Sequence, residues 1–235
     1  MRIGILGGSF NPVHFGHLRA AIEVRERLGL DRVELVPAKE QPHKYQGDML
    51  PFHSRVALIK LALKGVPGLA VNPLEGERQG PSYTCDTLAE YRARLPEAER
   101  FFILSALTLF NLPSWRHGLE LPELVDLVVV PRGRAGRVET AEFLASQWPL
   151  ARPADPGPAD LAWSFVSGGR ILYLSTPRIE ISSTIVRDRW RRGRCLTGLV
   201  PPAVERVLEK GGPDFDAGWG VRFVHREEPA ADLRV

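Results

Sequence analysis

The stretch that decides the fold runs from Ile3 to His17 and has the sequence IGILGGSFNPVHFGH. A short apolar run, Ile3 to Leu6, is followed by two glycines, a proline and two histidines, at the point where a buried strand would lead into a helix. The unpaired backbone N–H groups at the start of a helix and the helix dipole both favour negative charge. The stretch therefore predicts an anion site at the carboxyl end of the first strand.

The two histidines strengthen this interpretation. His14 and His17 are three residues apart, so both imidazoles would lie on one face of the first helical turn and could reach a single phosphate. Gly7 and Gly8 are expected to let the backbone pass close to a ligand or adopt a positive φ. A lone histidine or a Gly-Gly turn is usually only structural, so the prediction depends on their combination. The GxGxxG and GxxxxGK[ST] fingerprints are both absent.

Short apolar runs alternate with segments of helical spacing along the rest of the chain. The helical patterns end at Gly29, at Gly65 and before Pro96. This alternation predicts an α/β fold in which a largely parallel sheet carries helices on both faces. Ligands of such sheets bind beyond the carboxyl ends of the strands, where the opening turn lies. The expected strands are residues 3–6, 33–36, 69–71, 101–104, 127–130 and 171–174.

The second half of the chain has clear breaks. Residues 152–169 contain PADPGP and are expected to form a surface loop, whereas residues 201–210 are expected to form a helix that Gly211 and Gly212 end. We expect a domain at 1–212 and a C-terminal tail at 213–235, either irregular or an added strand. Its apolar patch, residues 219–224, favours docking of the tail on the domain.

Composition narrows the class of protein. The 235 residues are 44% hydrophobic and carry a formal charge of +3, which suits anionic ligands without requiring nucleic acid. Cys85 and Cys195 form no CxxC pair, so we expect no disulfide framework and no zinc site. The uncharged segment 101–115 is too short and too polar to span a membrane, and a secretion signal is not evident. These observations favour a cytoplasmic protein.

A second candidate anion site is ISSTIVRDRWRRG, residues 181–193. Ser182, Ser183 and Thr184 are good residues to cap a helix, and Arg187 follows about one turn later. Hydroxyls, free amides and a guanidinium would then face the same anion. The remaining arginines are expected to coat the exposed side of the helix: Arg189, Arg191 and Arg192.

These two motifs carry a resemblance to a known family. GGSFNPVHFGH resembles the HxGH signature of the nucleotidyltransferase superfamily, its flanks resemble the bacterial nicotinate-mononucleotide adenylyltransferases, and ISSTIVR resembles that family's ISSTxxR motif. The resemblance covers residues 1 to about 210. It implies a Rossmann-like, doubly wound domain with His14 and His17 as catalytic residues, His17 being closest to the reacting α-phosphate. It also implies an ATP site formed by Gly7, Gly8, Ser9, Phe10, Lys44, Ser182, Ser183 and Arg187.

Other stretches resemble the same family. PAKEQPHK, residues 37–44, would bring Lys44 to phosphates, whereas Arg55 is as well explained by a place on a helix surface. GPSYTCDTL, residues 80–88, and LPSW, residues 112–115, imply a pyridine-nucleotide site formed by Tyr83, Thr84 and Trp115. The residues alone would make Trp115 a core residue, although its flat face also suits a pyridine ring.

One stretch departs from the family pattern. Family members usually carry Gly-x-Asp after the fourth strand, and this chain has Ser105, Ala106 and Leu107 there. A carboxylate expected to bond a nucleotide sugar is therefore replaced by leucine. Nucleotide binding could be weakened, rearranged or altered in specificity.

The resemblance implies transfer of AMP from ATP to nicotinate mononucleotide, which yields nicotinate adenine dinucleotide and pyrophosphate in NAD biosynthesis. Mg²⁺ would be held by the ATP phosphates and water, without protein ligands. The alternatives are another acceptor, such as nicotinamide mononucleotide, and a catalytically weakened nucleotide-binding regulatory protein. Nucleic-acid binding through residues 187–194 is disfavoured, because Trp190 is the only aromatic residue there. The sequence leaves homo-oligomerisation open.

Overall fold

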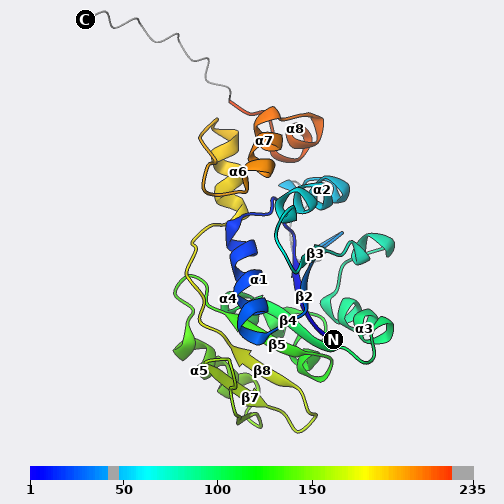
Figure 1. The fold of residues 1–235 in the computed structure, drawn as a ribbon, viewed down its shortest axis with the longest axis vertical. Coiled ribbons are helices and arrows are strands. Elements are labelled where there is room, and N and C mark those ends of the chain that lie inside the picture. The colour runs from blue at the N-terminus through cyan, green and yellow to red at the C-terminus, as the bar shows by residue number, and fades with distance from the viewer. Residues whose placement is uncertain (42–47, 224–235) are drawn as a thin grey trace, which may run out of the picture.

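The computed structural model describes residues 1–41 and 48–223. Its strands form one eight-stranded sheet in the order β3-β2-β1-β4-β5-β8-β7-β6 (Figure 1). All neighbours from β3 to β8 pair in parallel, whereas β7 and β6 are antiparallel. The predicted largely parallel sheet is therefore confirmed. The strands are β1 (Arg2–Gly8), β2 (Arg32–Pro37), β3 (Leu69–Val71), β4 (Glu99–Ser105), β5 (Asp126–Val130), β6 (Arg152–Pro153), β7 (Leu161–Ser164) and β8 (Arg170–Tyr173).

Helices cover both faces of the sheet, as predicted. Side chains of a strand alternate between the faces, so Phe101 and Ile103 lie in one apolar core, and Phe102 and Leu104 in the other. Helices α1, α2, α6, α7 and α8 contribute to the first core, and α3, α4 and α5 to the second. The helices are α1 (Phe15–Leu28), α2 (Phe52–Leu63), α3 (Thr84–Arg94), α4 (Ala106–Phe110), α5 (Arg137–Gln147), α6 (Ser183–Arg191), α7 (Pro202–Lys210) and α8 (Pro213–Trp219), with 3-10 turns at η2 (Leu74–Glu77), η3 (Leu112–Ser114) and η4 (Gly118–Glu123).

The strand order sets the position of a ligand site. β1 pairs with β2 on one side and β4 on the other, so the order reverses between β1 and β4. In open parallel sheets, ligands bind beyond the carboxyl ends of the strands at such a reversal. The turn that follows β1 therefore lies where the fold favours a ligand.

The loop predicted for residues 152–169 is partly wrong. β6 and β7 form an antiparallel pair, in which Arg152 lies opposite Ser164, and β7 continues the sheet beside β8. Residues 154–160, which include most of the Pro- and Gly-rich stretch, form the connection between them. Turn residues mark a chain reversal, but they do not tell whether the segments on either side pair.

The C-terminal segment also differs from the expectation of an irregular tail or an added strand. Pro213 starts helix α8, where its missing N–H costs nothing. Phe215 and Trp219 are buried against Trp190 of α6, and Figure 1 shows α8 together with α6 and α7 near α2. Among the described residues, no helix has both the length and the apolar character that a bilayer crossing requires.

Candidate active site

The first turn connects β1 to α1 and carries both histidines. His14 is the N-cap of α1, and its backbone N–H donates to Nδ1 of His17, 3.3 Å away. The two imidazole rings are stacked, with centroids 3.7 Å apart and an interplanar angle of 28°. The prediction that both side chains share one face is therefore confirmed.

The glycines of the motif make room for rings. A Cβ on Gly7 would lie 3.3 Å from the Phe102 ring, and one on Gly8 would lie 3.3 Å from the Phe10 ring. A Cβ on Gly16 would lie 3.0 Å from the ring of His14. The expected positive φ at Gly7 or Gly8 is wrong, because both belong to β1 and the positive φ belongs to Phe10, at 47°. The turn therefore depends on aromatic packing as well as on backbone freedom.

His14 is buried in an unusual electrostatic state. Its side chain is only 3% exposed, and within residues 1–41 and 48–223 its Nδ1 has no hydrogen-bond partner. Burial, helped by the positive charge of Arg132, lowers the His14 pKa to about 3. The ring is therefore neutral near pH 7, and a buried polar atom left unsatisfied is typical of a functional site.

His17 is oriented by its neighbours. Since its Nδ1 accepts a hydrogen bond from the His14 backbone, a neutral His17 ring carries its proton on Nε2, which is then a donor. The Phe10 ring meets the imidazole edge-on, with centroids 4.8 Å apart. These two contacts hold the His17 ring in one orientation.

Helix α6 brings the second motif onto this turn. Ser182 caps the helix by accepting from the backbone N–H of Ile185, at 3.2 Å. Ser183 Oγ donates to the Pro12 carbonyl at 2.9 Å, and Arg187 Nη1 donates to the Asn11 carbonyl at 2.9 Å. The two motifs, which are separated by about 170 residues, therefore lie in direct contact.

The other arginines of this segment only partly follow the expectation of a solvated face. Arg191 pairs with Asp48 at 2.8 Å and donates to the Trp219 carbonyl at 2.5 Å, so it joins three segments. Arg189 donates to the Cys195 carbonyl at 2.9 Å, whereas Arg192 is exposed as expected. The prediction for Arg191 is wrong because its partners come from distant parts of the chain.

Arg55 is buried, so a place on the helix surface is wrong. It is 1% exposed and donates to the carbonyls of Ser9 at 2.8 Å, Lys39 at 3.2 Å and Leu50 at 3.0 Å. Burial lowers the pKa of its guanidinium to about 10, so the group stays charged at neutral pH. Arg55 therefore fixes the first turn relative to the segment that follows β2.

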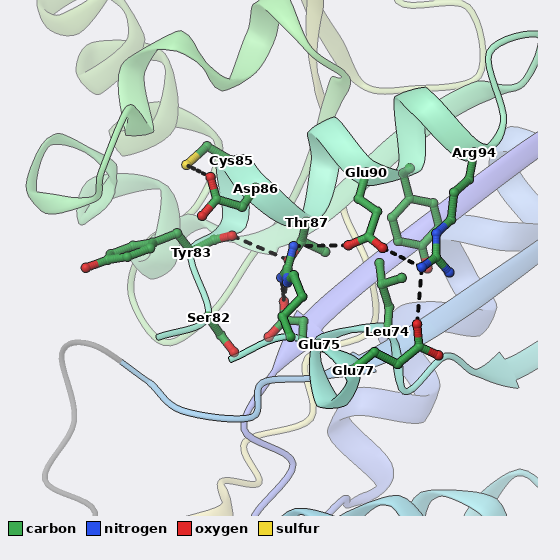
Figure 2. A network of polar contacts seen from close by, with 12 residues as sticks. Leu74, Glu75, Glu77, Ser82, Tyr83, Cys85, Asp86, Thr87, Glu90 and Arg94 are labelled. Atoms are coloured by element: carbon green, nitrogen blue, oxygen red, sulfur yellow. Dashed lines mark hydrogen bonds and ion pairs between the residues drawn. The ribbon is translucent and has the colours of Figure 1, made fainter. Parts of the chain in front are cut away.

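The segment after β2 is in turn tied to the start of α3. Ser82 Oγ accepts from the backbone N–H groups of Lys39 at 3.0 Å and Glu40 at 3.3 Å. Figure 2 shows Ser82 next to Tyr83, just before helix α3. In the first turn of α3, the Thr87 hydroxyl donates to Glu75 Oε1 at 2.7 Å. Lys44, expected at phosphates, lies outside the described residues.

The two stretches expected to bind a pyridine nucleotide approach each other through Arg116. Its guanidinium lies 4.9 Å from the centre of the Tyr83 ring and 3.6 Å from the Asp86 carboxylate. Trp115 is half-buried and, like Tyr83, packs against the second core. The structure therefore brings Tyr83, Thr84 and Trp115 to one region, together with the Arg116–Asp86 ion pair.

The departure at residues 105–107 lies at the end of β4. Ser105 caps α4 by accepting from the Thr108 backbone N–H at 3.2 Å. Leu107 is 44% exposed, and a Cβ on Gly133 would be 3.8 Å from its side chain. Leu107 therefore borders the loop that carries Arg132 near His14.

Sequence reasoning missed Asn11, Arg116 and Arg132. Asn11 is inside the motif but resembles an ordinary turn residue, and only its burial, at 3% exposure, distinguishes it. Arg132 follows β5 and lies near His14, and Arg116 follows η3 and lies near Tyr83. The sequence alone does not indicate which loop arginines lie near these residues. In the described part of the chain, no three His, Cys, Asp or Glu side chains are arranged to hold a metal.

Comparison with known proteins gives consistent results. The family model described as cytidylyltransferase-like matches residues 5–189. A "Probable nicotinate-nucleotide adenylyltransferase" from Maridesulfovibrio salexigens is 38% identical over 93% of this chain and all of its own length, and one from Chromohalobacter salexigens is 40% identical over 88% and 93%. The Plasmodium falciparum nicotinic acid mononucleotide adenylyltransferase, solved with NaAD, has a TM-score of 0.68 at 16% identity and covers 87% of this chain and 93% of its own.

The burial of His14 predicts a pH dependence of stability. Between its lowered folded pKa and the ordinary pKa near 6.5, only the unfolded chain binds a proton there, so the free energy of unfolding falls as pH falls. From pH 7.5 to pH 5 this residue should remove about 2 kcal/mol. Urea denaturation at pH 7.5 and pH 5 should show a smaller acid loss for His14→Asn than for wild type. The exposed His117→Asn variant should retain most of the wild-type loss; a full loss in His14→Asn would contradict the account.

Proposed function

This chain belongs to the nicotinate-nucleotide adenylyltransferases of the cytidylyltransferase-like family, and from that premise we infer that it transfers AMP from ATP to nicotinate mononucleotide. The products are nicotinate adenine dinucleotide and pyrophosphate, a step of NAD biosynthesis. The observation that carries the inference is the contact of α6 with the histidine turn. That contact gathers imidazole, hydroxyl and guanidinium groups at the carboxyl end of β1.

The reaction needs little covalent chemistry from the protein. An oxygen of the acceptor's 5′-phosphate attacks the α-phosphorus of ATP, a new P–O bond forms, and the bond to the β-phosphate oxygen breaks in line with it. The negative charge that develops on the leaving oxygen departs with pyrophosphate. Catalysis then consists of positioning the two nucleotides and stabilising charge on the equatorial oxygens.

The proposed catalytic residues are His14 and His17. His17 Nε2–H would donate to an oxygen of the α-phosphate, and its fixed orientation supports this role. The neutral ring of His14 would provide a second polar contact without adding a buried charge in the free enzyme. Ser183 and Arg187 would stabilise the β- and γ-phosphates. The full proposed ATP site is Gly7, Gly8, Ser9, Phe10, Lys44, Ser182, Ser183 and Arg187.

The acceptor would bind between the start of α3 and the end of η3, at Tyr83, Thr84 and Trp115. The backbone N–H groups at the start of α3 suit a carboxylate, and the Trp115 face suits a pyridine ring. Arg116 lies beside Tyr83, where its half-exposed guanidinium is shared with the Asp86 carboxylate at 3.6 Å and would turn toward the carboxylate of the acceptor. These groups favour the acid, nicotinate mononucleotide, over its uncharged amide.

Nucleotidyltransferases of this kind use a divalent cation, and we propose Mg²⁺ for this chain. The described residues contain no cluster of acidic or histidine ligands, so the cation would be held by ATP phosphates and water, as Mg²⁺ commonly is. When bound, it would neutralise charge on the phosphates. The chain's own contribution would be the histidine, serine and arginine donors.

The acceptor and the role of His17 can be tested together. Pyrophosphate release should be measured with ATP and a panel of acceptors that includes nicotinate and nicotinamide mononucleotides. We expect the highest kcat/KM with nicotinate mononucleotide. His17→Ala should lower kcat by about 10² to 10³, with little change in acceptor affinity, whereas the exposed His117→Ala should leave it unchanged. Turnover by His17→Ala at the wild-type rate would remove His17 from the mechanism.

The proposed charge at the acceptor site predicts a selective effect of Arg116→Gln. The KM for nicotinate mononucleotide should rise about three- to tenfold, a modest change because the side chain is 52% exposed. The KM for nicotinamide mononucleotide should change less. Arg94→Gln is a matched control, since Arg94 is 54% exposed and pairs with Glu90 of the same helix and with Glu77 of η2. Equal effects on the two acceptors would exclude a role for Arg116 in reading the carboxylate.

The second candidate is a catalytically weakened nucleotide-binding regulatory protein. It is favoured by Leu107, which stands where the family usually has a carboxylate. The position follows the cap of α4, where a carboxylate is compatible with the helix end, so Leu107→Asp should fold. If the family carboxylate contact is restored, the KM for ATP should fall about tenfold. Leu107→Ala separates this effect from the simple removal of bulk. ATP binding without pyrophosphate release from any acceptor, in wild type and Leu107→Asp, would favour the regulatory protein.

A further inference from the structure

Asn11 connects the histidine turn to two distant segments through its side chain. It is 3% exposed, and its Nδ2 donates to the Asp48 carbonyl at 2.6 Å. Its Oδ1 accepts from the backbone N–H of Leu50 at 3.0 Å and from the indole Nε1 of Trp219 at 3.3 Å. The Trp219 bond is buried and joins residues 208 positions apart.

The backbone of Asn11 takes part in the candidate site itself. Its carbonyl accepts the hydrogen bond from Arg187, and the next carbonyl, of Pro12, accepts the bond from Ser183. The orientation of the Asn11 peptide therefore decides where both donors of α6 lie. Whatever holds the Asn11 side chain also holds these two carbonyls.

Trp219 is itself held firmly. It is 2% exposed, and its ring packs edge-on against Trp190, with centroids 5.3 Å apart, and against Phe215, with centroids 5.4 Å apart. Its carbonyl accepts from Arg191 at 2.5 Å. The preceding Gly218 lies so close to the segment 49–50 that a Cβ there would be 3.1 Å from the Met49 carbonyl. The indole N–H thus has a fixed direction.

We propose that Trp219 is a positioning residue for ATP binding, which acts through the carboxamide of Asn11. The substrate in this statement rests on the proposed function; the positioning itself rests on the contacts above. The indole N–H of Trp219 donates to Asn11 Oδ1 and so fixes the Asn11 side chain. The fixed side chain keeps the Asn11 backbone in place, and the Asn11 carbonyl orients the Arg187 guanidinium by accepting its hydrogen bond. Helix α8 thereby belongs to the phosphate site without touching the nucleotide.

The proposal predicts which substrate is affected. Trp219 is in the apolar core that includes α1 and α6, whereas Tyr83 and Trp115 pack against the core on the opposite face of the sheet. Loss of the indole N–H should therefore weaken ATP binding and spare the acceptor. A general loss of folding would affect both substrates alike.

The experiment compares Trp219→Phe with Trp190→Phe. Both tryptophans belong to the same aromatic cluster, both are buried, and both indoles donate a hydrogen bond, but that of Trp190 goes to the Leu208 carbonyl at 2.6 Å, away from the turn. Phenylalanine preserves an aromatic ring at each position. Trp219→Phe should raise the KM for ATP about fivefold and leave the acceptor KM within about twofold. Trp190→Phe should lower the Tm and leave both KM values unchanged.

Two further readouts separate failure of the proposal from failure of the proposed function. Calorimetry measures ATP binding without an acceptor. If the wild type binds ATP but releases no pyrophosphate with any acceptor, the proposed function is refuted, and the ATP affinities of the two variants still test the positioning. Hydrogen exchange of residues 9–14 in the free protein needs no ligand, and it should be faster in Trp219→Phe than in Trp190→Phe. Equal exchange in the two variants, or equal rises in both KM values, would overturn the proposal.

Discussion

The site depends on two hydrogen bonds to backbone carbonyls, from Arg187 to Asn11 and from Ser183 to Pro12. Because the Asn11 carbonyl is neutral, this bond orients the guanidinium without cancelling its charge. Arg191, one turn further along the helix, is paired with Asp48 and Asp188 and is largely neutralised. The same helix thus carries Arg191, which is held by carboxylates, and Arg187, which contacts a neutral carbonyl and which we propose to bind phosphate.

The histidines complement this arrangement. A guanidinium attracts a polyanion from any direction, whereas the two imidazoles, whose centroids are 3.7 Å apart, would define where individual phosphate oxygens accept a hydrogen bond in the proposed site. His14 is kept neutral by burial and by Arg132, so the turn does not concentrate several repelling charges before a ligand binds. Charge and direction are therefore supplied by different residues, which is useful in a reaction that consists mainly of placing phosphates.

The sequence predicted features that have a local signature. The six expected strands formed, because buried parallel strands are short apolar runs, and α1 began at the predicted turn. The errors concern long-range contacts: Arg55 and Arg191 are buried or paired by segments far along the chain, and β6 and β7 pair across a proline-rich connection. The positive φ expected at Gly7 or Gly8 occurs at Phe10 instead. Gly7 and Gly8 are small because the rings of Phe102 and Phe10 lie close to them. Asn11 has no signature apart from its position in the motif.

The bond between Asn11 and Trp219 also has a consequence for the order of events during synthesis. The histidine turn leaves the ribosome early, but its last side-chain partner is translated 208 residues later. A nascent chain that ends before α8 leaves Asn11 with one partner fewer and the α6 tryptophan without its aromatic cover. If Trp219 positions Asn11 as proposed, full nucleotide affinity is expected only once α8 has been translated and has docked.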